Sequence, residues 1–369
     1  MTFAFSLILT LYCAMLVAFL IGWVKVRRQT MPRRSESPPP VSVVVAVRNE
    51  TQNIQNLIQL LTTQAFPKGR VEVILVNDHS TDETAALARR SAEGFSHVQI
   101  LDLPEGKEGK KAALQYGIER ATFEVIATTD ADCTFSKNWL TCISSYFELA
   151  ENKMVVGAVK LSDGNSFFSQ LQVTELVSLA GSTAASVGFN HPIMCNGANL
   201  AFRKSVFEEV GGYDDNMAIP SGDDEFLMRK IRARYPQGIR FLNYYEAVVS
   251  TPPQKTLGDL IQQRLRWAGK WKHNSDPLTK SLAVFILLAQ VSFVAIFFGL
   301  VTGKWSAVAL IVPKIFLEGV LIYWVGRFLD VRFDVPSFIL LQIVYPFYVL
   351  GVGIVSLFSS YRWKGRNYR

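Results

Sequence analysis

The sequence predicts an α/β domain with a mixed, mostly parallel β-sheet, joined to N-terminal and C-terminal transmembrane helices. From residue 41 to about residue 250, short apolar runs alternate with helical patterns, which is typical of sheets covered by helices on both faces. Outside that stretch long apolar runs dominate, and the mean hydropathy of the chain is +0.20. The predicted order of segments is an N-terminal transmembrane anchor (1–24), a basic, proline-rich linker (25–40), the α/β domain (41–255), an amphipathic interface helix (256–276), C-terminal membrane segments (277–360) and a basic tail (361–369).

The first apolar run, Phe3 to Trp23, contains no charged residue and is about as long as the ~20 residues that a helix needs to cross a bilayer. Basic residues follow it at Lys25, Arg27 and Arg28, and none precedes it. This pattern favours a retained signal anchor over a cleaved signal peptide, and it places the following domain in the cytoplasm. We therefore expect an integral protein of the cell (inner) membrane.

Four apolar, β-like runs predict the parallel part of the sheet, and a further run at Cys195–Phe202 predicts a later strand. Between them, Ser80 stands three residues before Glu83, which is the spacing of a capping box at a helix start. The four runs are Val41–Val47, Val71–Val76, Val98–Leu101 and Val125–Thr128.

Asp130 and Asp132 follow the last of these runs, separated by one alanine. Carboxylates at positions i and i+2 after a strand can face one divalent cation, and Mg²⁺ takes oxygen ligands from carboxylates and substrate phosphates. The alternative is ordinary turn chemistry, in which aspartate is common at a strand end. The pair is therefore a candidate metal site, and the strength of this prediction depends on the residues around it.

Polar residues also follow the other predicted strands, where open α/β sheets bind their ligands. Basic groups near a carboxylate-held cation predict a pocket for a diphosphate. The sequence contains neither a P-loop nor a Gly-x-Gly-x-x-Gly motif, so it does not indicate a P-loop nucleotide site or a dinucleotide-binding site. The polar residues in question are Arg48, Asn49, Glu50, Asp78, and Lys110 or Lys111.

The ordered motifs of residues 41–275 resemble those of membrane-bound family 2 glycosyltransferases with a GT-A domain, including ceramide-type and other lipid-acceptor enzymes. The motifs are VVVAVRNE, VNDHSTDET, GKKAAL, TTDADC, NGANLAFRKSVFEEVGGYDD, SGDDEFL and QQRLRW. The resemblance implies inverting transfer from a nucleotide-sugar donor, with Mg²⁺ or Mn²⁺ bridging the donor phosphates to Asp130 and Asp132.

The same resemblance assigns further residues to the donor. Glu50 and Asp78 would lie around the nucleoside, beside Arg48 and Asn49, and Lys110 would lie near the diphosphate. Lys111 is the neighbouring alternative.

An inverting displacement requires a base opposite the leaving nucleotide, and SGDDEFL supplies acidic candidates at a predicted helix start. In the family a Glu-Asp pair ends in the catalytic aspartate, which corresponds to Asp224, while Asp223 stands in place of the glutamate. The departure leaves both aspartates as candidates. The alternative is that these acids only stabilise the helix N-terminus.

Leu257 to His273 is predicted to form an amphipathic helix at the membrane surface. Within it, Gln263, Arg266 and Trp267 match the family's Gln-x-x-Arg-Trp motif, which implies donor contacts for Gln263 and Arg266 and an acceptor contact for Trp267. A plain basic amphipathic helix is the rival explanation. Phe167–Val187 is also predicted as an amphipathic helix, because its polar side chains would be costly in lipid.

Leu282–Val301, Ala307–Trp324 and Phe338–Phe358 each approach spanning length. Within the second run, Lys314 and Glu318 lie four residues apart and are able to pair or to mark a lipid-headgroup path. Three full crossings would place the basic tail outside, against the positive-inside rule. One run is therefore expected to be re-entrant or interfacial, with break points at Pro313, Pro336 or Pro346.

The few apolar segments favour a single transfer onto a hydroxyl of a membrane lipid. A processive polysaccharide synthase, with a partner subunit, is the alternative reaction. A non-catalytic membrane scaffold that only binds nucleotide sugar is the alternative of another class, and the retained aspartates Asp130, Asp132 and Asp224 argue against it. Nucleic-acid binding is not expected, because the basic residues behind the net charge of +7 cluster at membrane flanks.

Overall fold

The structure, a computed structural model, describes residues 2–162, 164, 166–217, 219, 221–270, 276–303, 305, 308–358, 361–363 and 366–368. The chain divides into two compact units. We call Val26–Ser162 with Ser186–Pro252 the sheet unit, and Met1–Lys25 with Asp163–Ala185 and Pro253–Arg369 the helical unit. Residues 163–185, which the sequence placed inside the α/β segment, thus group with the helical unit.

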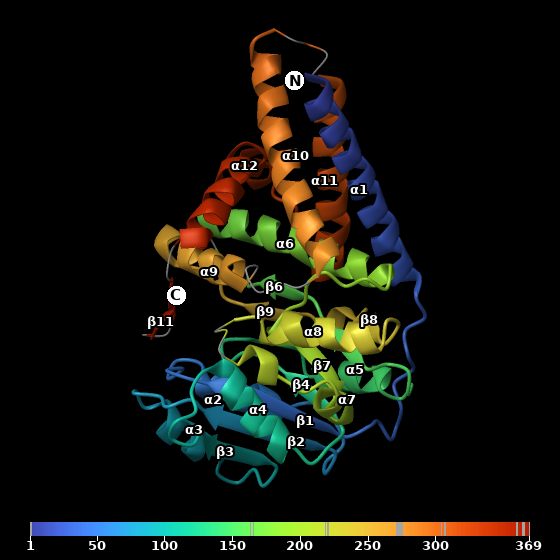
Figure 1. Cartoon of the computed structure of the whole chain (residues 1–369). Helices are drawn as coiled ribbons and strands as arrows, with labels where there is room; N and C mark the ends of the chain where they lie inside the picture. Colours follow the sequence, from blue (N-terminus) through green and yellow to red (C-terminus); the bar gives the residue numbers. More distant parts are fainter. Residues whose placement is uncertain are drawn as a thin grey trace. The chain divides into compact units, whose positions relative to one another are not determined.

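The main sheet of the sheet unit has seven strands in the order β3-β2-β1-β4-β7-β5-β8, and Figure 1 shows β1, β2 and β3 side by side. Strands β1 to β4 pair in parallel, whereas β7 runs antiparallel to both β4 and β5. This arrangement confirms the predicted mixed, mostly parallel sheet. The strands are β1 (Val41–Val47), β2 (Val71–Asn77), β3 (Val98–Asp102), β4 (Val125–Thr128), β5 (Met154–Val156), β7 (Leu200–Arg203) and β8 (Ile239–Phe241), and a small parallel pair is formed by β6 (Val159–Leu161) and β9 (Val249–Thr251).

Helices cover both faces of this sheet because side chains alternate between the faces along each strand. In β1, Val43 and Val45 pack into the cluster that contains α2, α3 and α5, while Val44 packs into the cluster that contains α4, α7 and α8. The helices of this unit are α2 (Ile54–Thr62), α3 (Thr84–Ala92), α4 (Lys110–Arg120), α5 (Trp139–Tyr146), α7 (Lys204–Glu209) and α8 (Asp223–Arg234), with 3₁₀ turns η1 (Gly197–Asn199), η2 (Asp214–Asn216) and η3 (Tyr245–Ala247).

Two local predictions in this unit are wrong because polar side chains bind the main chain instead. Helix α3 begins at Thr84 without a side-chain cap, and the Ser80 hydroxyl accepts a hydrogen bond from the Asn49 N–H at 3.1 Å. The predicted strand Cys195–Phe202 starts only at Leu200, since the Asn196 side chain accepts a hydrogen bond from the Ala198 N–H at 3.0 Å and forms η1. Both changes bring loop residues towards the carboxyl ends of the parallel strands.

The segment that joins α1 (Thr2–Arg28) to β1 is held against the sheet unit by hydrogen bonds. The Asn243 amide donates to the Val26 carbonyl at 3.0 Å, Arg70 donates to the Pro38 carbonyl at 2.9 Å, and the Ser144 hydroxyl donates to the Pro39 carbonyl at 2.6 Å. Residues 26–40 are therefore part of the sheet unit.

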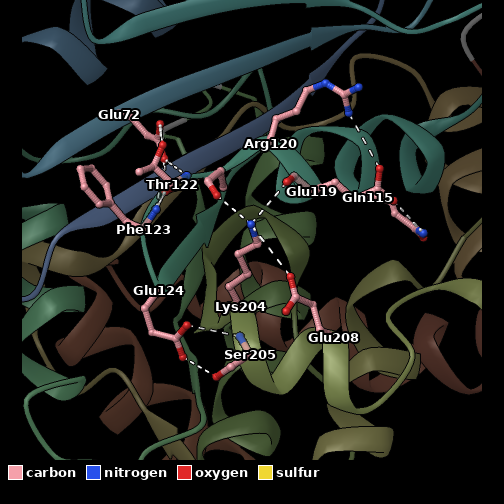
Figure 2. A network of polar contacts seen from close by, with 12 residues as sticks. Glu72, Gln115, Glu119, Arg120, Thr122, Phe123, Glu124, Lys204, Ser205 and Glu208 are labelled. Carbon is pink, nitrogen blue, oxygen red and sulfur yellow. Dashed lines mark hydrogen bonds and ion pairs between the residues drawn. The ribbon is translucent and has the colours of Figure 1, made fainter.

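The edge of the main sheet at which the parallel strands begin carries a network of polar contacts (Figure 2). The Glu72 carboxylate accepts hydrogen bonds from the Ser42 hydroxyl, from the Thr122 N–H and hydroxyl, and from the Phe123 N–H. The Lys204 ammonium donates to the Ala121 carbonyl at 2.8 Å, just after α4 ends. We call this edge the amino edge and the other the carboxyl edge.

Four helices among the described residues are long and apolar enough to cross a membrane. They are α1, α10 (Pro277–Val301), α11 (Val308–Leu329) and α12 (Val335–Phe358), and the helical unit also contains α6 (Phe167–Gly188), α9 (Leu257–Gly269) and the antiparallel pair β10 (Tyr361–Trp363) and β11 (Arg366–Tyr368). Helices α11 and α12 continue through Pro313 and Pro346, so neither proline ends a helix. Residues 271–273 of the predicted interface helix lie outside the described residues.

Buried polar side chains connect the helices of this unit. As predicted, Lys314 pairs with Glu318, at 3.0 Å, and Glu318 also accepts hydrogen bonds from the Tyr12 hydroxyl at 2.7 Å and the Gln342 amide at 2.9 Å. Helix α6 forms where it was predicted, but Glu175 is buried within it rather than on a solvated face. The helical unit thus buries more polar side chains than the sequence indicated.

Candidate active site at the carboxyl edge

The loops after β1 and β2 are joined by Arg48 and Asn49. The Arg48 guanidinium donates to the carbonyls of Asp78 and His79 at 2.6 and 2.9 Å. Asn49 and His79 both have positive φ angles, 52° and 51°, a region that asparagine adopts more readily than most residues. The guanidinium of Arg48 therefore supports the loop that presents Asp78.

Asp78 and Glu50 are buried at this edge and bind neighbouring turns. The Asp78 carboxylate accepts hydrogen bonds from the Gly109 N–H at 3.1 and 3.2 Å, one to each oxygen. Gly109 has φ +94°, a conformation that favours glycine. Since Gly109 directly precedes α4, Asp78 fixes the start of the helix that carries Lys110. Glu50 accepts a hydrogen bond from the Asn53 amide at 2.7 Å.

Lys110 is the centre of a cluster of acidic side chains. Its ammonium lies 2.8 Å from an Asp130 oxygen and 3.3 Å from an Asp223 oxygen, and its side chain is 18% exposed. Burial alone would lower the pKa of Lys110, but the attraction of Asp130 and Asp223, with Asp224 nearby, raises it above its ordinary value. Lys110 is therefore charged throughout the neutral range and holds together carboxylates from the loop after β4 and from the start of α8.

Lys111, the neighbouring alternative, points elsewhere. Its ammonium donates to the Asn216 carbonyl at 2.7 Å and lies 5.0 Å from the centre of the Phe226 ring. Successive residues on a helix face different directions, so only one of the two lysines is able to join the acidic cluster. The structure places Lys110 there.

Asp223 and Asp224 open α8, directly after Gly222, whose φ of +81° turns the chain into the helix. One Asp224 oxygen accepts a hydrogen bond from the Gly197 N–H at 3.0 Å, and the other accepts one from the Glu225 N–H at 2.7 Å. These bonds fix the carboxylate of Asp224 beside the Lys110 cluster.

Gly197 is a site residue that sequence reasoning did not single out, although it lies within the NGAN stretch. A Cβ atom at this position would lie 3.0 Å from an Asp223 oxygen and 3.4 Å from the Lys110 ammonium. The Thr128 hydroxyl at the end of β4 donates to the Gly197 carbonyl at 2.9 Å and holds the turn in place. Glycine therefore lets η1 approach the acidic cluster closely.

Asp130 and Asp132 offer the oxygen ligands that Mg²⁺ and Mn²⁺ prefer. The Asp130 side chain is 40% exposed, and an Asp132 oxygen lies 3.5 Å from the Thr251 hydroxyl. Burial and the two aspartates raise the pKa of the adjacent Cys133 thiol above its ordinary value. The described residues hold no group of three acidic, histidine or cysteine side chains arranged around a metal. The residues fit a cation that takes its remaining ligands from substrate or water.

The remaining predicted residues, Gln263, Arg266 and Trp267, lie in the helical unit on α9. Helix α9 begins after Thr256, whose hydroxyl accepts a hydrogen bond from the Asp259 N–H at 3.1 Å. A helix thus lies within the range where the amphipathic helix was predicted, but its Arg264 is buried and paired with Glu175 at 2.7 Å, which the sequence did not indicate.

Residues 42–211 match the family model described as glycosyl transferase family 2. Glycosyltransferase AglE of Haloferax volcanii is 27% identical over 236 residues, which cover 62% of this chain and 71% of that protein. The poly-β-1,6-N-acetyl-D-glucosamine synthase of Staphylococcus aureus is 26% identical over 235 residues, which cover 62% of this chain and 53% of that protein. The match thus spans about half the length of the synthase.

Among solved structures, the mannosyltransferase PcManGT from Pyrobaculum calidifontis, in complex with GDP-Man and Mn²⁺, is similar with a TM-score of 0.64. The sequence identity is 19%, and the match covers 97% of this chain and 99% of that chain. At this identity the likeness shows a shared fold and nothing finer. Together, the matches show that residues 42–211 form a region similar to glycosyl transferase family 2, within a chain whose α/β fold is shared with a solved glycosyltransferase.

Proposed function

We propose that the protein transfers a sugar from a nucleotide-sugar donor, with inversion at the anomeric carbon, to a hydroxyl of a membrane lipid. The observation that carries the proposal is that acidic side chains from the loop after β4 and from the start of α8 meet around Lys110 at the carboxyl edge. Ligands of open α/β sheets bind at this edge. A base and a cation site side by side are what a displacement from a diphosphate leaving group requires.

In this proposal Asp224 is the base. Its carboxylate, held by the Gly197 N–H, accepts the proton of the acceptor hydroxyl as that oxygen bonds to the anomeric carbon and the bond to the leaving diphosphate breaks. Asp223 is the alternative base, but its pairing with Lys110 favours a role in holding the ammonium in place. Lys110 faces the region where negative charge develops on the leaving group.

Asp130 and Asp132 would hold a divalent cation, Mg²⁺ or Mn²⁺. When bound, the cation would stabilise the negative charge of the leaving diphosphate. The resemblance to the family assigns the nucleoside to Glu50 and Asp78, with Arg48 and Asn49 supporting that loop. It assigns further donor contacts to Gln263 and Arg266 and an acceptor contact to Trp267. These assignments are part of the proposal.

The four apolar helices support an acceptor that is itself embedded in the membrane. The basic residues that end α1, Lys25, Arg27 and Arg28, support a cytoplasmic sheet unit on a protein anchored in the cell (inner) membrane. The likeness to a polysaccharide synthase supports a second candidate, a processive synthase that acts with a partner subunit.

The test uses membranes that contain the full chain, incubated with Mn²⁺ or Mg²⁺ and a panel of radiolabelled nucleotide sugars. GDP-mannose is included because the similar solved mannosyltransferase binds it. We expect metal-dependent label in an organic extract. Label in an insoluble polymer instead would favour the synthase. Membranes with Asp224→Asn protein are the control, and equal labelling by that variant would contradict the assigned base.

A further inference from the structure

The helical unit contains a buried ion pair next to the motif residues Gln263 and Trp267. Glu175 on α6 and Arg264 on α9 are only 9% and 7% exposed. The Arg264 Nε donates to one Glu175 oxygen at 3.2 Å, and its Nη2 donates to the other at 2.7 Å. A two-point contact of this kind fixes the plane of the guanidinium as well as its position. Glu175 therefore orients Arg264.

Arg264 in turn contacts two side chains of the motif. Its Nη1 donates to the Gln263 side-chain oxygen, and its guanidinium carbon lies 4.3 Å from the centre of the Trp267 ring. A guanidinium over an aromatic face attracts the ring and restricts its orientation. A continuous set of contacts thus leads from α6 through Arg264 to Gln263 and Trp267.

Helix α6 also holds the chain that enters α9. The Gln172 amide donates to the Gln254 carbonyl at 3.0 Å and accepts from the Gln254 N–H at 2.9 Å. Gln172 and Glu175 are three residues apart, so they lie on one face of α6. This face therefore fixes α9 at two places, before its first turn and in its middle.

The charges of the pair stabilise each other. Burial alone would lower the pKa of Arg264, but Glu175 raises it above its ordinary value. Neutralising Glu175 would leave a buried guanidinium without its counter-ion, which is far more disruptive than breaking an exposed pair. We therefore expect the side chain of Arg264 to move when the charge of Glu175 is removed.

We propose that Glu175 is a positioning residue of this enzyme, which acts through Arg264 to hold Gln263 and Trp267 in the arrangement that sugar transfer requires. The inference rests on the proposed function, because the roles of the motif residues are part of that proposal. Glu175 is not assigned a contact with donor or acceptor. The sequence placed this residue only among the polar positions of a surface helix.

The first test measures the environment of Trp267 without requiring a substrate. Full-length protein in lipid nanodiscs is compared with Trp267→Phe protein to isolate the fluorescence of Trp267. We expect Glu175→Gln to shift the emission maximum of the Trp267 fluorescence and to increase the quenching of this fluorescence by acrylamide. The control is Glu72→Gln, which removes the charge of a buried carboxylate in the sheet unit, and it should leave the Trp267 fluorescence unchanged. Identical Trp267 signals in wild-type and Glu175→Gln protein would overturn the inference.

The second test measures transfer in the same preparations with the nucleotide sugar that the wild-type protein uses. We expect Glu175→Gln to lower the rate at least about tenfold, with partial recovery in Glu175→Asp, and Glu72→Gln to change it less than about twofold. If Glu175→Gln and Glu72→Gln lower the rate equally, the positioning role is wrong and the proposed function stands. If wild-type protein transfers no sugar from any donor, the proposed function fails, and the Trp267 signal still decides the positioning role.

Discussion

The two edges of the main sheet are both rich in charged side chains, but they use them differently. At the amino edge the Glu72 carboxylate is surrounded by neutral donors, and Lys204 donates to main-chain carbonyls near the end of α4 (Figure 2). At the carboxyl edge, Asp130 and Asp223 both pair with the single ammonium of Lys110. Hydrogen bonds to the main chain lock secondary structure, whereas several like charges gathered around one cation are costly to the fold and are typical of functional sites.

The comparison explains why a charged cluster alone does not identify an active site. At the amino edge, Glu72 binds the N–H groups of a turn and Lys204 binds carbonyls at a helix end, which are structural roles. The carboxyl edge gathers acids from the loop after β4 and from the start of α8, which are far apart in the sequence, and glycine at position 197 allows their close approach. Mutations should therefore affect activity at one edge and stability at the other.

The largest effect is expected for Asp224→Asn. Loss of the base should lower transfer by about 10²–10⁴-fold, because proton removal in the transition state contributes about that much. Binding of the donor should change little, since the substitution keeps the shape of the side chain. Single-turnover assays and equilibrium dialysis with radiolabelled donor measure the two quantities. Wild-type turnover in this variant would disprove the assignment.

The next largest effect is expected for Asp130→Asn, which tests whether this residue binds the cation rather than acting as the base. Removing one carboxylate should weaken donor binding in the presence of Mn²⁺ at least about tenfold, or about 1.4 kcal/mol. Donor binding in the presence of EDTA should be the same in variant and wild type. The measurement is a Mn²⁺ titration of donor affinity, with Asp132→Asn in parallel. Unaltered Mn²⁺ dependence in both variants would rule out these residues as ligands.

Gly197→Ala tests the close approach at the carboxyl edge. The added methyl group would lie 3.0 Å from an Asp223 oxygen, so the carboxylate or the turn must shift. We expect the rate to fall by about 10–100-fold, since small displacements at reacting groups have effects of that size. Gly351→Ala is the control, because a Cβ there meets nothing within 4 Å. Equal rates for the two variants would show that the close approach is not needed.

The smallest effect on activity is expected at the amino edge. Glu72→Gln replaces a buried carboxylate that accepts several hydrogen bonds, and it should lower the free energy of unfolding of the sheet unit by about 1–3 kcal/mol. The rate of transfer at a temperature where the protein stays folded should remain within about twofold of wild type, as for substitutions remote from the chemistry. Thermal denaturation and transfer assays on one preparation check both statements. If Glu72→Gln greatly lowered the rate of transfer without lowering stability, the amino edge would not have a purely structural role.

The sequence predicted the parallel strands well because their apolar runs are continuous and end in polar residues. It could not predict the loops, where short-range alternatives compete. The hydroxyl of Ser80 was expected to cap α3, yet it binds Asn49 from another loop. The side chain of Asn196 binds two residues ahead and delays the start of β7. The hydrogen-bond partner of such a side chain depends on which loop packs beside it in the folded protein, and the spacing of residues along the sequence does not reveal this.

The candidate site shows the same limit. The acidic residues were found because they follow strands or open a helix, but the choice between Lys110 and Lys111 required the direction of each side chain from α4. Gly197 is recognisable as a site residue only when the carboxylates around it are known. The burial of Arg264 on a helix with a basic surface pattern depends on Glu175, which is 89 residues away in the sequence.

The hydrogen bonds between residues 26–40 and the sheet unit bear on how this protein is best prepared without its first helix. A shortened protein that begins at residue 41 would lose the carbonyls that Asn243, Arg70 and Ser144 bind, and the loss of these partners would lower the free energy of unfolding of the sheet unit. A cut placed just before Val26 keeps these partners.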